Sequence, residues 1–318
     1  MTAPHSACGL RPCHRQGVDA DAGLFGPGSV TWRLHADPMF GIAGLRALLL
    51  QALHPVAAQG VSDHSSFRSD PWGRFTRTAE FVAVTTYGTT AEALTMGARV
   101  RALHARMSTT DPTSGRGYPV DDPGLLAWVH NCLVESTLAV LERSGVEISA
   151  ADADRYVAEQ VRAAALVGLD AADVPHDRAA LDAYFVQVRP LLRAGRAARE
   201  EASYVIAPPM RPRYALAGRP AWSSMAGLAF AALPPWARRL YSIPELPAAA
   251  ALHGAATTVA LHALRASLRG VQAVVPPLRE SPHRRSARER LAQGPRTEDE
   301  SSTHDSSTTA QDRTEDAG

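Results

Sequence analysis

The chain contains the stretch Asp70-Pro71-Trp72-Gly73-Arg74-Phe75-Thr76-Arg77-Thr78-Ala79-Glu80-Phe81. Asp70 suits the N-cap of a helix that begins at Pro71, because its carboxylate accepts the free amide hydrogens of the first turn and proline loses nothing at that position. One face of this helix carries four residues at helical spacing, Arg74, Arg77, Thr78 and Phe81. A face that is half cationic and half apolar is a poor core stripe. It suits an anionic ligand with a flat apolar body.

A second helix follows directly. Thr89 and Glu92 have the spacing of a capping box, in which each side chain bonds an end amide of the helix. The predicted helix runs from Thr90 to about Met107, with His104 at the edge of its apolar stripe. Gly97, two turns earlier, leaves room for a bulky group to approach. Only one short connection separates His104 from the two arginines.

Helical patterns continue along the chain, and strand patterns do not appear. Apolar residues at helical spacing follow Pro38 and end at His54-Pro55, and Asp122-Pro123 opens a long helix that ends at Gly145. Ser149 and Asp177 begin two further helices, the second interrupted by Pro190. Two later helical runs cover about 222–233 and 247–269, and the second is predicted to pack through Leu252, Val259, Leu264 and Leu268.

The composition divides the chain into three parts. Residues 1–22 have no periodic apolar pattern and are predicted to be a disordered leader. Residues 277–318 are charged and rich in Ser and Thr, so they bury too little surface to offset the entropy of ordering and are predicted to be a disordered tail. Residues 23–276 are predicted to be a single all-α, multi-helix domain.

Overall composition excludes several classes of protein. With 318 residues and 45% hydrophobic content the chain has ample material for a core, and a net charge of +1 spread along the sequence gives no field for nucleic acid. No secretory signal and no apolar run long enough to span a bilayer is visible, so no transmembrane segment is predicted and peripheral membrane contact stays open. Three cysteines make no disulfide framework, and the expected compartment is the cytosol.

Each candidate residue has a structural alternative. A lone histidine on an apolar helix face is usually a hydrogen-bonded core residue, and helix arginines are usually solvated or paired with a carboxylate such as Glu80. Patterns for zinc, for a di-iron bundle, for a serine hydrolase and for nucleotide phosphates are missing from the sequence. His104 stands out because its neighbours are an apolar turn and the arginine-bearing helix.

A series of motifs accompanies these residues in order: Leu48-Leu49-Leu50-Gln51-Ala52-Leu53-His54-Pro55, Gly60-Val61, His64-Ser65, Asp70-Pro71, Arg74, Arg77-Thr78, Gly88, Glu92, Val100, His104, Trp128-Val129-His130 and Leu233-Pro234-Pro235-Trp236 to Tyr241. The series covers roughly residues 25 to 275. It resembles the oxygenase family of MpaB and the latex-clearing rubber oxygenases.

The resemblance implies an all-helical domain with a globin-like core that binds haem b non-covalently. His104 would be the proximal iron ligand, and Arg74, Arg77 and Thr78 would match the catalytic R-x-x-[K/R]-T motif of the family. Arg74, Val100, Phe81 and His54 would contact the cofactor. Rubber-cleaving members carry a lysine where this chain has Arg77, and a guanidinium stays protonated and is a poor iron ligand, so rubber as a substrate is not transferred.

The implied partners are dioxygen, a small apolar substrate of the unsaturated-lipid or isoprenoid kind, and an electron donor of unknown identity. Two other functions stay open at this point. One is a non-catalytic carrier of haem or of an apolar ligand, and the other is a helical scaffold whose arginine face binds a partner protein.

Overall fold

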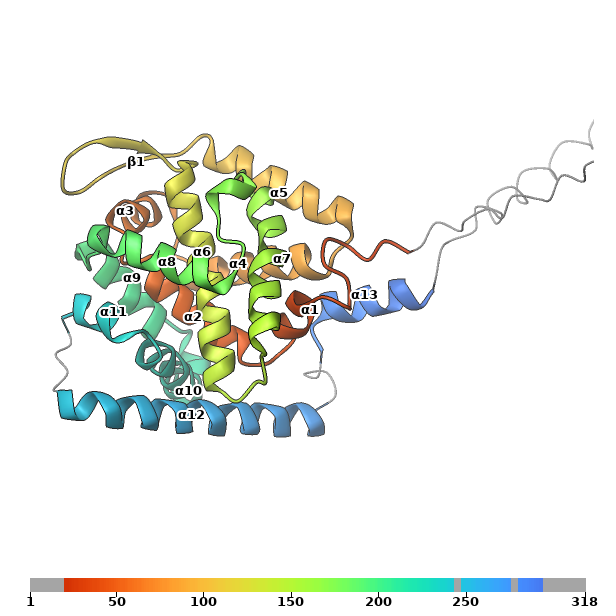
Figure 1. Ribbon diagram of the computed structural model, residues 1–318. Coiled ribbons are helices and arrows are strands. Elements are labelled where there is room, and N and C mark those ends of the chain that lie inside the picture. Colours follow the sequence, from red (N-terminus) through yellow and green to blue (C-terminus); the bar gives the residue numbers. More distant parts are fainter. Residues whose placement is uncertain (1–19, 243–246, 276–279, 294–318) are drawn as a thin grey trace, which may run out of the picture.

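The structure, a computed structural model, describes residues 20–242, 247–275 and 280–293. Within these residues thirteen α-helices and one two-stranded sheet confirm the predicted all-α class (Figure 1). The globin-like core stays a prediction. The elements are α1 (Val30–His35), α2 (Phe40–Gln51), α3 (Pro55–His64), α4 (Pro71–Tyr87), α5 (Thr90–His104), β1 (Ser108–Thr110), β2 (Gly117–Pro119), α6 (Pro123–Arg143), α7 (Ala150–Leu166), η1 (Ala171–Asp173), α8 (Arg178–Val188), η2 (Arg189–Leu191), α9 (Arg196–Ile206), α10 (Pro212–Ala231), α11 (Pro235–Leu240), α12 (Pro247–Val274) and α13 (Pro282–Ala292).

The helix boundaries follow the local signals in the sequence. Asp70 caps α4 by accepting a hydrogen bond from the amide of Gly73 at 2.9 Å, and Pro71 is the first residue of the helix. Both halves of the capping box between Thr89 and Glu92 are present at the start of α5. Gly145 follows α6 with a φ of +79°, a left-handed conformation that a residue without Cβ adopts easily.

The core is built around α2. This helix is apolar on nearly every side and packs against α6, α9 and α10. Leu49 and Leu50 are completely buried, and the facing side of α6 contributes Trp128, Leu138 and Leu141. Helix α2 ends at Gln51, three residues before the predicted stop at His54-Pro55. Pro55 instead begins α3, and His54 before it has the extended backbone that a residue preceding proline favours.

A buried ion pair lies inside this core. Arg46 of α2 is 2% exposed and pairs with the carboxylate of Glu135 on α6. Its guanidinium also donates to the Ser136 hydroxyl at 2.7 Å and to the carbonyl of Ala232 at 3.1 Å. Every face of the charged group therefore has a partner, which is what burial of a charge requires.

Three elements differ from the sequence expectations. No strand is predicted from the sequence, but Ser108–Thr110 and Gly117–Pro119 pair as a short antiparallel hairpin after α5. Helix α9 was not predicted. Helix α10 begins at Pro212, ten residues before the predicted start at Trp222, and it accommodates Pro220 in its interior.

The predicted disordered tail contains helix α13, so disorder is wrong for this part of it. Ala287 is completely buried beside Trp32 and Tyr87, which supplies the apolar contact that the composition did not suggest. Arg290 donates to the backbone carbonyl of Asp21 at 3.0 Å and to that of Tyr87 at 3.0 Å. Residues 277–279 and 294–318 of the predicted tail and residues 1–19 of the predicted leader lie outside the described residues.

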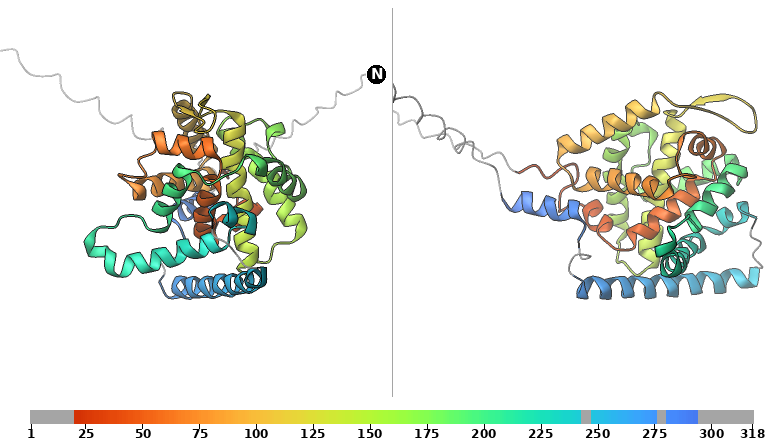
Figure 2. Two further views of the ribbon diagram at one scale, coloured as in Figure 1. Left: turned by 90° about the vertical axis from the view of Figure 1, so that its left-hand side faces the viewer. Right: turned by 180° about the vertical axis from the view of Figure 1, so that it is seen from behind.

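Helix α12 packs through only part of the predicted face, because Leu264 and Leu268 contact the core but Leu252 and Val259 do not. Leu252 is 74% exposed and Val259 is 68% exposed, so both point away from the core. The inward face also carries the buried Leu261 and the ion pair of Arg265 with Asp37 at 2.9 Å. The helix lies along the outer margin of the molecule in every view (Figures 1 and 2).

One described helix, α6, is long and apolar enough to cross a membrane, and α2 with α3 passes only as a pair bent by 106°. In α6, 67% of the apolar window is buried inside the protein. This is weak evidence for a span, because the central helix of a protein core has the same length and composition.

We expect Arg46→Ala to lower the free energy of unfolding by about 3–5 kcal/mol, since it leaves the Glu135 carboxylate without its partner. Arg33→Ala is the matched control, because Arg33 pairs with Asp152 at the surface and such pairs contribute about 0–1 kcal/mol. Urea unfolding measures both variants. Equal destabilisation by the two changes would contradict a dominant role for the buried pair.

His35 gives the fold a pH dependence. Its ring stacks on Phe40 with centroids 4.1 Å apart, and its two nitrogens lie 2.9 Å from the Thr86 hydroxyl and 3.0 Å from the Tyr156 hydroxyl. Burial lowers the pKa of His35 to about 3 from an ordinary value of 6.5. The folded state therefore keeps the ring neutral, whereas the unfolded chain protonates it below 6.5.

Because the folded-state pKa of His35 is depressed, its contribution to the free energy of unfolding is fully present above pH 6.5. This contribution is lost as the pH falls toward about 3, by up to about 1.4 kcal/mol per pH unit. We expect His35→Gln to reduce this acid sensitivity. Chemical denaturation of both proteins at pH 7 and pH 5 tests it. An unchanged difference between the two pH values in the variant would show that other groups cause the acid sensitivity.

Candidate functional site

The two helices of the opening stretch adjoin one another in the structure. Helices α4 and α5 are in contact and are joined only through Gly88 and Thr89. Arg74 lies near the start of α4, and His104 is the last residue of α5. About 20 Å of helix therefore separates each of them from the connection between the two helices. Within the described residues, no hydrogen bond links His104 to Arg74 or Arg77.

His104 has one ring nitrogen without a hydrogen-bond partner within the described residues. This atom, Nδ1, is buried. Burial lowers the pKa of His104 below its usual range, and the nearby carboxylate of Asp121 only partly opposes this. The side chain is therefore a neutral imidazole near pH 7, the form that binds metals.

Arg74 is turned into the protein. Its Nη2 lies 2.7 Å from Oε1 of Glu201 on α9, with side chains that are 15% and 3% exposed. Burial raises the pKa of Glu201, and the Arg74 charge opposes that shift. The guanidinium is thus already committed to a protein carboxylate, and this ion pair attaches α4 to α9.

Arg77 and Thr78 lie on the uncovered part of α4. Arg77 is 62% exposed, donates to the Ser66 hydroxyl at 2.8 Å and lies 3.4 Å from Asp70 Oδ2. The Thr78 hydroxyl donates to the backbone carbonyl of Arg74 at 3.0 Å. The four residues predicted to share one face of α4 therefore have different surroundings. Helices α9 and α10 cover only the first turns of α4, with Arg74, and leave Arg77 and Thr78 exposed.

The other predicted cofactor contacts are spread around these helices. Phe81 and Val100 are half-buried on α4 and α5. His54 is the N-cap of α3, where its Nδ1 accepts a hydrogen bond from the amide of Ala57 at 3.4 Å. Burial lowers the pKa of His54, and the carboxylates of Asp111 and Asp122 oppose it. The structure thus gives His54 a capping role.

The room expected beside Gly97 is already filled. A Cβ at this position would lie 2.7 Å from the carbonyl oxygen of Leu166, the last residue of α7. Gly97 therefore allows α5 to pack closely on α7, and it does not leave space for a ligand.

Sequence reasoning missed Glu201, although a signal for it exists. Ala198, Ala202 and Val205 form the buried face of α9, and Glu201 lies on that same face. A carboxylate within an apolar stripe indicates a buried partner of opposite charge. Recognising α9 as a helix would have identified this position.

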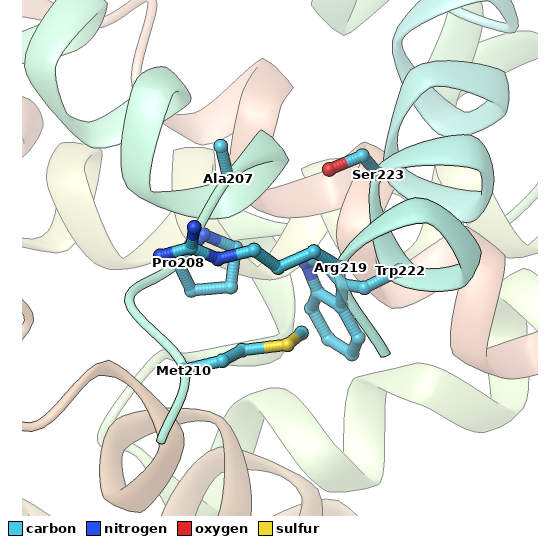
Figure 3. Close-up of a pocket in the computed structure, with 6 residues that line it drawn as sticks. All are labelled: Ala207, Pro208, Met210, Arg219, Trp222 and Ser223. Atoms are coloured by element: carbon cyan, nitrogen blue, oxygen red, sulfur yellow. The ribbon is translucent and has the colours of Figure 1, made fainter. Parts of the chain in front are cut away.

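A cluster of aromatic rings was also missed. Trp72 and Phe75 of α4 contact Trp222 of α10, with ring centroids 4.7 Å and 5.4 Å apart. Beside this cluster is a pocket of about 270 Å³ lined by Ala207, Pro208, Met210, Arg219, Trp222 and Ser223 (Figure 3). The pocket adjoins the same end of α4 that carries Arg74.

These features define an all-α protein with a neutral histidine beside an arginine-bearing helix. The family model for the catalytic domain of the ER-bound oxygenase mpaB/B'/rubber oxygenase matches residues 32–267. The chain therefore belongs to this oxygenase family. Searches of curated proteins and of solved structures each found no match.

We expect Arg74→Gln to lower the free energy of unfolding by about 3–5 kcal/mol, because it leaves the buried Glu201 carboxylate unpaired. Arg77→Gln is the control from the same helix, with an expected loss of about 0–1 kcal/mol for an exposed pair. Urea unfolding at pH 7 compares the two variants. If Arg77→Gln were the more damaging change, the division of α4 into a covered and an uncovered part would be wrong.

Proposed function

We propose that the protein is a haem b-dependent oxygenase that acts with dioxygen on a small apolar substrate. Membership of an oxygenase family supports the general activity. The observation that carries the haem assignment is the state of His104, a half-buried neutral side chain whose Nδ1 is buried without a hydrogen-bond partner among the described residues.

The residues around His104 fit a cofactor that needs one protein ligand. Within the described residues, no three side chains of His, Cys, Asp or Glu gather into a group that would hold a metal on their own. A single histidine suffices when a macrocycle supplies the remaining nitrogen ligands. Val100, one turn before His104, and Phe81 on α4 would offer apolar contact to such a ring.

Haem, when bound, supplies an iron that binds dioxygen. His104 would hold that iron from one side. Of the two arginines, Arg77 has the weaker protein partners, since they are exposed hydroxyl and carboxylate groups that solvent readily replaces. We therefore assign to Arg77 the binding of an anionic group such as a propionate. Arg74 would act by positioning α4, and direct catalytic roles for Arg74 and Thr78 stay predictions.

The proposal also includes a substrate class, an electron donor of unknown identity and a location in the cytosol. An apolar substrate of the unsaturated-lipid or isoprenoid kind follows from the resemblance described above. Arg77 in place of lysine keeps rubber itself outside the proposal.

We expect the purified protein, after incubation with haem, to show a Soret absorption band that shifts on reduction with dithionite. His104→Ala should lose the shift and most of the bound haem, because the proximal ligand is gone. His176→Ala is the control, since His176 is exposed and contacts only the backbone carbonyl of Ala171. An unchanged haem spectrum in His104→Ala would disprove the ligand assignment.

Oxygen consumption by the haem-loaded protein separates the alternatives. We expect uptake with at least one unsaturated lipid or isoprenoid in the presence of a reductant. A normal haem spectrum without uptake on any of them would favour a non-catalytic carrier. Protein that stays colourless after haem is added would favour a helical scaffold.

A further inference from the structure

The segment that follows Glu201 contains basic residues but no acidic ones. Residues 202–242 contain no aspartate or glutamate, and arginines occur at positions 211, 213, 219, 238 and 239. Elsewhere in the fold, described arginines repeatedly pair with nearby acids, as Arg74 does with Glu201 and Arg68 with Glu200. The segment therefore has an excess of positive charge in its sequence, and an exposed arginine within it would favour an anionic ligand.

The pocket shown in Figure 3 lies within this segment, and it has a fixed apolar wall. The indole Nε1 of Trp222 donates to the carbonyl of Val205 at 2.9 Å, and Trp72 packs edge-on against the ring. Met210 approaches closely because α10 has a glycine opposite it: a Cβ on Gly218 would lie 3.3 Å from the Met210 sulfur. These contacts hold the apolar side chains in place before any ligand arrives.

Arg219 is the one charged side chain that lines the pocket. It is exposed, and its side chain extends across the opening toward Pro208, with Met210 and Trp222 close by (Figure 3). No salt bridge joins Arg219 to an acid within the described residues. The other polar group in the pocket, the Ser223 hydroxyl, already donates to the carbonyl of Ile206 at 3.0 Å.

We propose that this pocket binds the carboxylate end of a straight-chain aliphatic acid. Arg219 pairs with the carboxylate, and the first methylene groups lie against Trp222 and Met210. The planar guanidinium matches a carboxylate with two parallel hydrogen bonds. A volume of about 270 Å³ is just below the ~300–1,000 Å³ of whole-ligand pockets, so the pocket takes one end of such a molecule. The site is separate from His104 and does not depend on haem.

The test uses the full-length protein and dodecanoate, at concentrations below those at which dodecanoate forms micelles, with binding followed by isothermal titration calorimetry. We expect saturable binding that Arg219→Gln weakens by about tenfold or more. Arg239→Gln is the matched control, since Arg239 is an exposed arginine of the same acid-free segment outside the pocket, and it should bind dodecanoate like the wild type. Dodecan-1-ol, which lacks the charge, should bind the wild type as weakly as dodecanoate binds Arg219→Gln.

Four results would overturn the proposal. Equal weakening by Arg219→Gln and Arg239→Gln would mean a diffuse basic surface. Equal affinity for dodecanoate and dodecan-1-ol would mean that no carboxylate is recognised. Binding to phosphatidylglycerol vesicles without binding of monomeric dodecanoate would mean a membrane surface as the source of the anion. Trp222→Leu, which keeps Arg219, should weaken dodecanoate and dodecan-1-ol alike, and full affinity in this folded variant would also contradict the pocket.

Discussion

Burial of α2 on nearly every side is the constraint on which the other helices depend. A helix enclosed in this way needs neighbours all around it, and α6, α9 and α10 supply them. Inside this packing, the charge on Arg46 is matched by Glu135, by the Ser136 hydroxyl and by the carbonyl of Ala232. The environment of Arg74 and the Arg219 pocket both follow from this arrangement, because α9 and α10 also contact the first turns of α4 and form the wall of the pocket.

Much of the fold could be predicted because its helix ends are encoded locally. Asp70, Thr89 and Asp122 each cap a helix as expected, since a side-chain oxygen close to free amides needs no tertiary information. The family relationship was likewise visible in the order of the motifs. The position of His104 at the end of α5 follows from the same local signals, but the burial of its Nδ1 does not, because burial depends on packing between distant segments.

The parts that could not be predicted are those decided by tertiary contact. Helix α13 has a charged composition, and only the fit of Ala287 beside Trp32 and Tyr87 explains why it packs on the fold. Arg74 and Arg77 look alike in the sequence, and their difference comes from Glu201, which lies far along the chain on α9. The outward orientation of Leu252 and Val259 on α12 has the same origin, since Asp37 draws Arg265 and its face of the helix inward.

The contact between Arg290 and Asp21 has a consequence for the connectivity of the chain. It brings the first and last described segments together, and the Asp21 carboxylate in turn accepts a hydrogen bond from the amide of Thr90 at 2.7 Å. This junction lies across the molecule from α11 (Figure 1). Because the first and last described segments meet here, we expect a circular permutant that links residue 20 to residue 293, with new ends in the exposed turn of the β1–β2 hairpin, to keep the helix packing.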